Sequence, residues 1–225
     1  MINNHPLIYY IIRQLKSSRR FDEIYVNSES ELIGEVARRY GINFYQRPEK
    51  YALSSSMIDE YIYDFLTHVE CDVLAVINPT SPFLTAAEMD RAIDQFLASD
   101  YDTQLCCERV QTHCFLDGKA VNFSTDGQHP RSQDLVPILA LNFAITIWDA
   151  KKFIRQFEKK GHGVYTGKLG FYITEGFSNI DIDYEEDFQL AAVLMQHMSD
   201  IKKENPAEYD PVLVPLIEKG IKTER

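Results

Sequence analysis

Residues 72–77, which read Asp-Val-Leu-Ala-Val-Ile, constrain the fold more than any other part of the chain. Their apolar residues are nearly continuous, whereas a strand with one face in water alternates apolar and polar side chains. A strand buried on both faces is typical of a parallel sheet that helices cover on its two sides. Segments with helical spacing, such as 7–15, alternate with short strand-like runs, such as 21–27. The sequence therefore predicts an α/β fold with a mainly parallel sheet between helices.

Length and charge limit the class of partner. A chain of 225 residues with 45% hydrophobic residues can form one sizeable α/β domain over residues 1–225. Its 23 Lys and Arg against 34 Asp and Glu leave a net charge of −11, which opposes binding to nucleic acid. No run approaches the roughly 20 apolar residues of a membrane span, and no signal peptide is apparent. The four cysteines lack metal-ligand spacing. We predict a cytoplasmic protein with reduced thiols that binds neither nucleic acid nor membrane.

The buried strand ends in a polar turn, Asn78-Pro79-Thr80-Ser81-Pro82. Ligands of open parallel sheets bind outside the carboxyl ends of the strands, so this turn is a candidate ligand site. The same residues also suit an ordinary turn and helix entry, and spacing alone does not choose between the two.

A second polar cluster comes late in the chain, where Asp181 and Asp183 alternate with isoleucines. On a strand these aspartates would share one face, roughly 7 Å apart. A divalent cation would remove their repulsion, and Mg²⁺ favours one or two carboxylates with water and substrate phosphates as its other ligands. A compatible interpretation is that Asp183 and Glu186 form a capping box for the helix that follows.

Residues 104–140 have a different pattern, which predicts a β-rich insertion. Asp117-Gly118 between two short apolar runs is a strong hairpin signal. The charged tail at 203–225 contains three prolines and is predicted to be peripheral.

Four segments, taken in order, resemble the acylneuraminate cytidylyltransferase family, which makes CMP-sialic acid and has relatives that make CMP-Kdo. They are Arg47-Pro48, 78–82, 131–135 and 180–188. The resemblance extends from about Pro6 to Met195. It implies a Rossmann-like three-layer α/β/α nucleotide-diphospho-sugar transferase fold, in which the β-rich insertion forms a homodimer. It also implies transfer of CMP from CTP to a sialic acid-like or Kdo-like sugar acid, with release of pyrophosphate and Mg²⁺ as cofactor.

The resemblance further implies the roles of single residues. Asp181 and Asp183 would be the catalytic metal ligands, and Arg47 would lie beside the nucleotide. The residues that would contact the sugar acid, some of them from the neighbouring subunit, are Asn78, Thr80, Ser81, Arg131, Gln133, Asn142 and Phe171 or Tyr172. The arginines would offset negative charge while the metal stabilises charge that develops on phosphate.

The sequence also departs from the family, which opens with a strand and a Gly- and Lys-rich loop around the nucleotide phosphates. Here five residues precede Pro6, and the first glycine is Gly34. Relative to the family we therefore expect an N-terminal truncation that removes the CTP phosphate loop and leaves neighbouring strands without backbone partners unless the sheet closes up. Leu84 and Phe143 depart from the family pattern too. Two alternatives stay open: a non-catalytic homologue that acts as a dimeric binding protein, and a D-x-D nucleotide-sugar glycosyltransferase.

Overall fold

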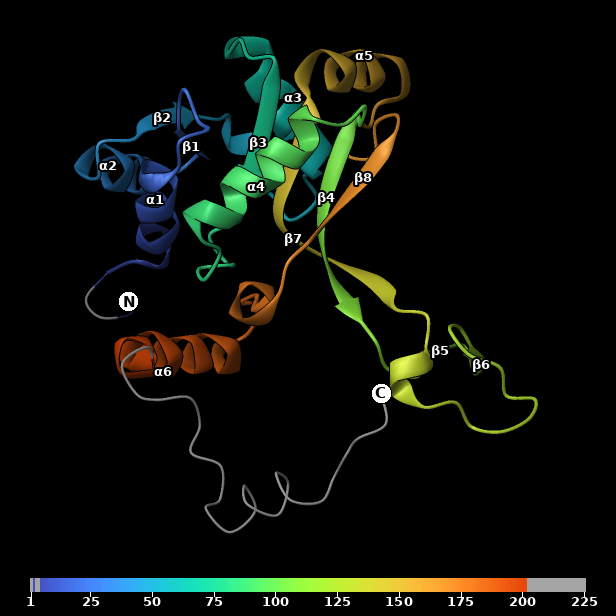
Figure 1. The fold of residues 1–225 in the computed structure, drawn as a ribbon. Coiled ribbons are helices and arrows are strands. Elements are labelled where there is room, and N and C mark those ends of the chain that lie inside the picture. The colour runs from blue at the N-terminus through green and yellow to red at the C-terminus, as the bar shows by residue number, and fades with distance from the viewer. Residues whose placement is uncertain (1, 3–4, 202–225) are drawn as a thin grey trace.

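The computed structural model describes residue 2 and residues 5–201 of the chain (Figure 1). Helices and strands alternate through the first half, as predicted. These elements are α1 (Leu7–Ser17), β1 (Tyr25–Ser28), α2 (Glu31–Arg39), β2 (Asn43–Gln46), the 3₁₀ helix η1 (Glu49–Ala52), α3 (Ile58–His68), β3 (Val73–Ile77) and α4 (Ala86–Leu97). The second half contains β4 (Thr103–Val110), β5 (Phe115–Leu116), β6 (Lys119–Ala120), η2 (Ser132–Asp134), β7 (Ile138–Asp149), α5 (Ala150–Lys160), β8 (Leu169–Ile173), η3 (Gly176–Asn179) and α6 (Glu185–Ile201).

The larger sheet has four strands in the order β3-β7-β4-β8, and β1 and β2 form a separate parallel pair. Strand β7 runs antiparallel to both β3 and β4, whereas β4 and β8 are parallel. The α/β class is confirmed. The expectation of a mainly parallel sheet is wrong for the larger sheet, because the long strand β7 lies between β3 and β4 in the opposite direction.

Strand β3 contributes to a core on each of its faces. Val73, Ala75 and Ile77 pack in a cluster with residues of α1 and α4. Leu74 and Val76 pack in a second cluster with residues of α3 and α5. This alternation follows from the two-residue period of a strand, and it gives the layers expected of an α/β/α fold.

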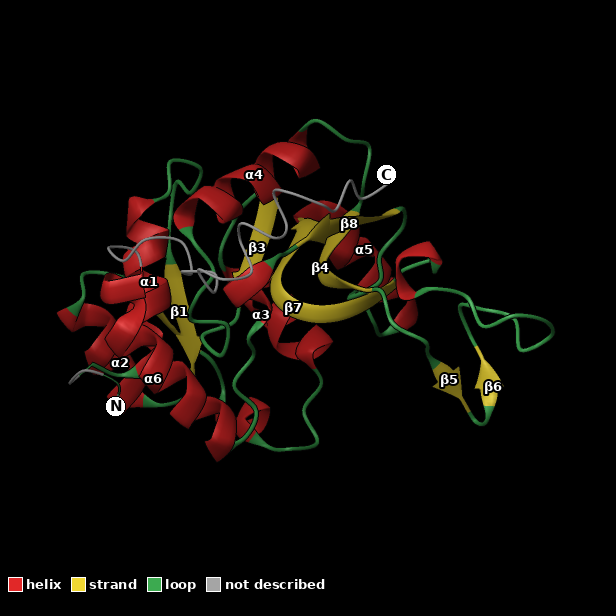
Figure 2. Cartoon of the chain, turned by 60° about the horizontal axis from the view of Figure 1, so that its bottom comes forward, coloured by secondary structure: helices red, strands yellow, loops and turns green. Residues whose placement is uncertain are grey.

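The two sheets face each other through unpaired edges. Within the described residues, β1 pairs only with β2 and β3 pairs only with β7. Both views show β1 beside β3 with no strand between them (Figures 1 and 2). Within the part of the chain that the structure describes, β1 and β3 are not paired with each other. All five residues of β3 are only half-buried in consequence.

An arm made of residues 111–137 projects from the far ends of β4 and β7 (Figure 1). Its hairpin turns at Asp117 and Gly118, whose φ angles of 49° and 75° fit the predicted tight turn. The arm falls within the predicted insertion at 104–140, while β4 itself belongs to the larger sheet.

Two further sequence predictions can be compared with the structure. All four cysteines are free. Among the described helices, none has the length and apolar character needed to cross a membrane. The predicted peripheral tail at 203–225 lies outside the described residues.

Candidate functional site

The turn after β3 and the aspartate segment are joined directly by the backbone. The N–H of Ile182 donates to the carbonyl oxygen of Thr80 at 2.9 Å. The turn itself is closed by the N–H of Ser81, which donates to the carbonyl of Asn78 at 3.1 Å. The polar turn and the paired aspartates therefore lie together, although about 100 residues separate them in the chain.

The aspartates do not lie on a strand, so that part of the sequence prediction is wrong. The 3₁₀ helix η3 ends at Asn179, and the chain from 180 to 184 belongs to no strand. The two isoleucines still point to the apolar side, because Ile180 and Ile182 pack in a cluster with Phe83 and Ala191. Side-chain packing and the one backbone bond from Ile182 to Thr80, not sheet pairing, hold this segment beneath the turn.

The predicted capping box of Asp183 and Glu186 is also wrong. Asp187 is the capping residue: its carboxylate accepts the N–H groups of Asp183 at 3.1 Å and Tyr184 at 2.9 Å. This arrangement satisfies backbone donors at the start of α6 and places negative charge near its positive end. The side chain of Asp183 is left exposed and makes none of the capping bonds.

The two aspartates have an environment that suits a cation. One carboxylate oxygen of Asp181 is buried and has no hydrogen-bond partner among the described residues. A buried carboxylate oxygen without a donor is costly, and a metal ion or an ordered water would satisfy it. No group of three or more His, Cys, Asp or Glu in the described part of the chain could hold a metal. Asp181 and Asp183 offer two carboxylates, a donor set that would fit Mg²⁺, because this ion takes few protein carboxylates and completes its shell with water and phosphate.

Asn142 joins the site through a hydrogen-bond network. Its amide nitrogen donates to the hydroxyl of Thr174 at 2.7 Å and lies 3.5 Å from the side-chain oxygen of Asn179. Its amide oxygen accepts the N–H of Ala144 at 3.2 Å. The amide is therefore used to connect β7 with the segment that leads to Asp181. The sequence analysis did not identify Thr174 or Asn179 as site residues. Only Asn179 could have been found from the sequence, because it stands close to Asp181.

Phe143 adopts a left-handed conformation with φ of 51°. This region is uncommon for residues other than glycine, and strained positions of this kind cluster at functional sites. The bond from the N–H of Ala144 to the Asn142 side chain spans the strained residue and stabilises the local bend. The register of β7 against β4 shifts at the same level, between Leu105 and Cys107.

The predicted residues of the turn and the neighbouring Leu84 differ in their exposure. Ser81 is 1% exposed and Leu84 is fully buried. The backbone N–H of Asn78 donates to the carbonyl of Ala144 and so ties the turn to β7. Asn78 and Thr80, which are half-buried, are the turn residues nearest to solvent in the predicted set.

Arg47, the predicted nucleotide contact, is already paired. Its guanidinium donates twice to Glu29, at 3.0 and 2.7 Å, and lies over the ring of Tyr61 at 4.8 Å. The pKa of Glu29 is lowered, chiefly because its own backbone N–H and then Arg47 stabilise the carboxylate. At the neighbouring end of β1, the side-chain oxygen of Asn27 is buried and has no hydrogen-bond partner in the described part of the chain, a feature that the sequence did not reveal.

Three predicted residues lie apart from the aspartates within one chain. Arg131 belongs to the arm and is ion-paired with Asp134, and the backbone oxygen of Gln133 accepts the Gln111 side chain. Phe171 is on β8, three strands from β3, which places it about 14 Å away across the sheet. The structure therefore groups Asp181, Asp183, Asn78, Thr80 and Asn142, and does not bring the other three into that group.

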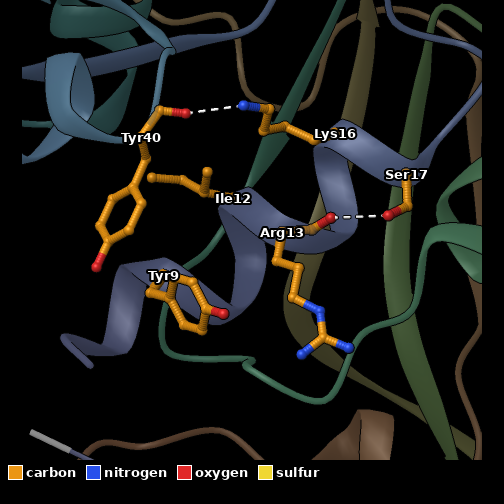
Figure 3. Close-up of a pocket in the computed structure, with 6 residues that line it drawn as sticks. All are labelled: Tyr9, Ile12, Arg13, Lys16, Ser17 and Tyr40. Carbon is orange, nitrogen blue, oxygen red and sulfur yellow. Dashed lines mark hydrogen bonds between the residues drawn. The ribbon is translucent and has the colours of Figure 1, made fainter. Parts of the chain in front are cut away.

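A cavity of about 280 Å³ lies between α1 and the end of α2 (Figure 3). Arg13 and Lys16 line it on α1, and the Lys16 ammonium donates to the carbonyl of Tyr40 at 2.9 Å. None of the predicted site residues lines this cavity.

The helix-covered sheet places the chain in the class of Rossmann-like α/β proteins. The chain belongs to the cytidylyltransferase family, whose model matches residues 1–210. This confirms the resemblance that the sequence motifs indicated.

Similar proteins agree with this assignment. The chain is 25% identical over 203 residues to the N-acylneuraminate cytidylyltransferase of Escherichia coli O18:K1:H7, covering 87% of this chain and 47% of that protein. It is 25% identical over 208 residues to post-translational flagellin modification protein B of Campylobacter coli, covering 87% and 86%. The chain thus spans about half the length of several N-acylneuraminate cytidylyltransferases that it matches.

Solved structures show the same fold. A CMP-2-keto-3-deoxy-manno-octonic acid synthetase in complex with CTP aligns with a TM-score of 0.64 at 10% identity, covering 88% of this chain and 90% of that one. A 4-diphosphocytidyl-2C-methyl-D-erythritol synthase from Anaerococcus prevotii aligns with a TM-score of 0.63 at 13% identity, covering 87% and 88%.

Proposed function

We propose that this protein transfers CMP from CTP to a sialic acid-like or Kdo-like sugar acid and releases pyrophosphate. The observation that carries the proposal is the bond from Ile182 to Thr80, which holds Asp181 and Asp183 beneath the polar turn of β3. The family and the relatives support cytidylyl transfer as the reaction class. A cytoplasmic location is part of this proposal, because CTP is available there.

Asp181 and Asp183 would hold Mg²⁺, which supplies positive charge to the reacting phosphate. The unpartnered oxygen of Asp181 and the exposed carboxylate of Asp183 are free to bind it. Asn78 and Thr80 would position the sugar acid so that its hydroxyl faces the α-phosphate of CTP. Asn142 would act indirectly, because its amide is already bonded to Thr174.

The test is pyrophosphate release from CTP and Mg²⁺ with either N-acetylneuraminic acid or Kdo. Asp183→Asn should abolish release, since it removes a metal ligand without changing the size of the side chain. Glu186→Gln, an exposed carboxylate three residues away, is the matched control and should keep wild-type activity. Activity of Asp183→Asn equal to that of Glu186→Gln would contradict the proposal.

We also propose that the arm forms a homodimer. It exposes Phe115, Leu116 and Val136, which are 59%, 69% and 71% exposed. Exposed apolar side chains on a projecting segment are typical of an interaction surface. In a dimer, Arg131 and Gln133 could reach the site of the other subunit, which would account for their position away from Asp181.

The oligomeric state tests the arm directly. Leu116→Asp should shift the species measured by light scattering from dimer to monomer. Leu32→Asp is the control, because Leu32 is equally exposed, at 68%, but lies on α2. A wild-type chain that is monomeric at micromolar concentration would refute the dimer.

A second candidate is a non-catalytic homologue that works through the arm. It is favoured by the ion pair of Arg47 with Glu29, which neutralises the predicted nucleotide contact. Under this alternative, CTP with Mg²⁺ produces neither heat on titration nor a thermal shift, while the dimer persists.

A further inference from the structure

Strand β7 is interrupted by a bulge at the level of the candidate site. Leu105 pairs with Thr146 and Cys107 pairs with Leu141, so the one residue between them on β4 lies opposite residues 142–145 of β7. A bulge takes residues out of the regular ladder of a sheet, and bulges beside functional sites redirect side chains. The polar groups of this bulge must therefore find partners outside the ladder.

The hydroxyl of Thr174 lies where three strands meet. Thr174 follows β8 directly and is 2% exposed. Its hydroxyl donates to the carbonyl of Cys107 at 3.2 Å and accepts the side-chain amide of Asn142 at 2.7 Å. The backbone N–H of Thr174 donates to the same carbonyl at 2.9 Å. One buried hydroxyl therefore joins β4, the end of β8 and the bulge of β7.

The hydrogen bonds continue from the bulge to the polar turn after β3. The amide oxygen of Asn142 accepts the N–H of Ala144 at 3.2 Å. The carbonyl of Ala144 in turn accepts the N–H of Asn78, the first residue of the turn, also at 3.2 Å. A run of polar contacts thus connects the hydroxyl of Thr174 with the turn.

Thr174 also begins the segment that leads to the aspartates. The 3₁₀ helix η3 starts two residues after it and ends at Asn179, whose side-chain oxygen lies 3.5 Å from the amide nitrogen of Asn142. Asp181 follows two residues later. The bond from Ile182 to the turn holds the other end of the segment. The carboxylates are therefore fixed from both sides, and the hydroxyl of Thr174 is the side-chain group at the first anchor.

We propose that Thr174 is a positioning residue for Asp181 and Asp183, and that it acts through Asn142. This inference rests on the proposed function, because it concerns the same cation site. Without the hydroxyl, the amide of Asn142 loses its 2.7 Å bond, and the segment after β8 adopts the binding geometry for a smaller fraction of the time. The apparent affinity for an ion falls by that fraction, while the site with the ion bound is unchanged.

Thr174→Val tests the proposal, because it removes the hydroxyl and keeps the size of the side chain. The Mg²⁺ concentration for half-maximal effect is measured twice, by the shift of thermal unfolding and by pyrophosphate release. It should rise at least about threefold in both, while the rate at saturating Mg²⁺ stays within about twofold of the wild type. Thr174→Ser keeps the hydroxyl and should restore the wild-type concentration.

Thr166→Val is the matched control for a loss of stability alone. Thr166 is 3% exposed and lies before the other end of β8, where its hydroxyl donates to the carbonyl of Gly163 at 2.6 Å. The variant loses a buried hydrogen bond of the same kind, so its loss of stability should be similar to that of Thr174→Val. Its half-maximal Mg²⁺ concentration should equal that of the wild type.

The inference is overturned if Thr174→Val has the half-maximal Mg²⁺ concentration of the wild type, or if Thr174→Ser is as impaired as Thr174→Val. The thermal titration does not need the reaction, so a failure of cytidylyl transfer and a failure of this inference are told apart. A wild-type chain whose unfolding does not respond to Mg²⁺ would overturn both the metal role and the inference.

Discussion

The N–H of Ile182 donates a hydrogen bond to the carbonyl of Thr80, and this bond places the aspartate pair under the turn that ends β3. The bond is formed by backbone groups, so substitution of the neighbouring side chains leaves it in place. Chemistry at Asp181 and Asp183 can thus be tested separately from the position of the segment.

Asp181→Asn should abolish the thermal stabilisation that Mg²⁺ gives the protein. The wild-type carboxylate has a buried oxygen without a partner, and an amide at this position binds a cation poorly. Thermal unfolding with and without 5 mM Mg²⁺, an amount of about physiological order, measures the effect. Glu186→Gln should retain the wild-type shift, and a shift retained by Asp181→Asn would rule out the metal role.

Asp187→Ala should lower the free energy of unfolding by about 1–2 kcal/mol, because two backbone N–H groups at the start of α6 lose their acceptor. Glu186→Ala removes a neighbouring charge but no capping bond, and should cost less than about 0.5 kcal/mol. Urea unfolding of the two variants compares them. Equal losses would mean that Asp187 does not cap the helix.

Replacements of Phe143 should rank by their tolerance of a left-handed backbone. Phe143→Asn and Phe143→Val both remove the ring, but asparagine adopts φ near 51° readily and a β-branched residue does not. The asparagine variant should be more stable than the valine variant by about 1 kcal/mol or more. Chemical denaturation of the two variants measures this difference in stability. A valine variant more stable than the asparagine variant would show that the backbone at this position is not strained.

Asp102 should stabilise the fold in a pH-dependent way. It accepts from the ammonium of Lys152 and, at 2.7 Å, from the N–H of Lys168. These bonds, that of Lys152 first, hold the pKa of Asp102 below its usual 3.8. Because the folded pKa is depressed, the stabilisation is present above about pH 4 and is lost as the pH falls through the lowered value.

Asp102→Asn should therefore cost about 1–2 kcal/mol at pH 7, and the cost should become smaller as the pH falls below about 4. Asp100→Asn is the control: Asp100 pairs with Lys168, but its side chain is 78% exposed, and exposed ion pairs contribute little. Urea unfolding at both pH values measures the difference. A cost for Asp102→Asn that is the same at pH 3 as at pH 7 would exclude the charged interaction.

The sequence by itself determined the class of fold, the strand β3, the hairpin at Asp117-Gly118 and the family. These follow from local signals, namely apolar periodicity, turn residues and motifs in a fixed order.

Only the tertiary structure decided which candidate residues come together. The direction of β7, the cap formed by Asp187, the pairing of Arg47 with Glu29 and the position of Phe171 three strands from β3 each depend on contacts between segments far apart in the chain. The residues next to a charged or amide side chain do not determine which distant residue it will bind. Its partner is set only when the helices and the sheet pack together.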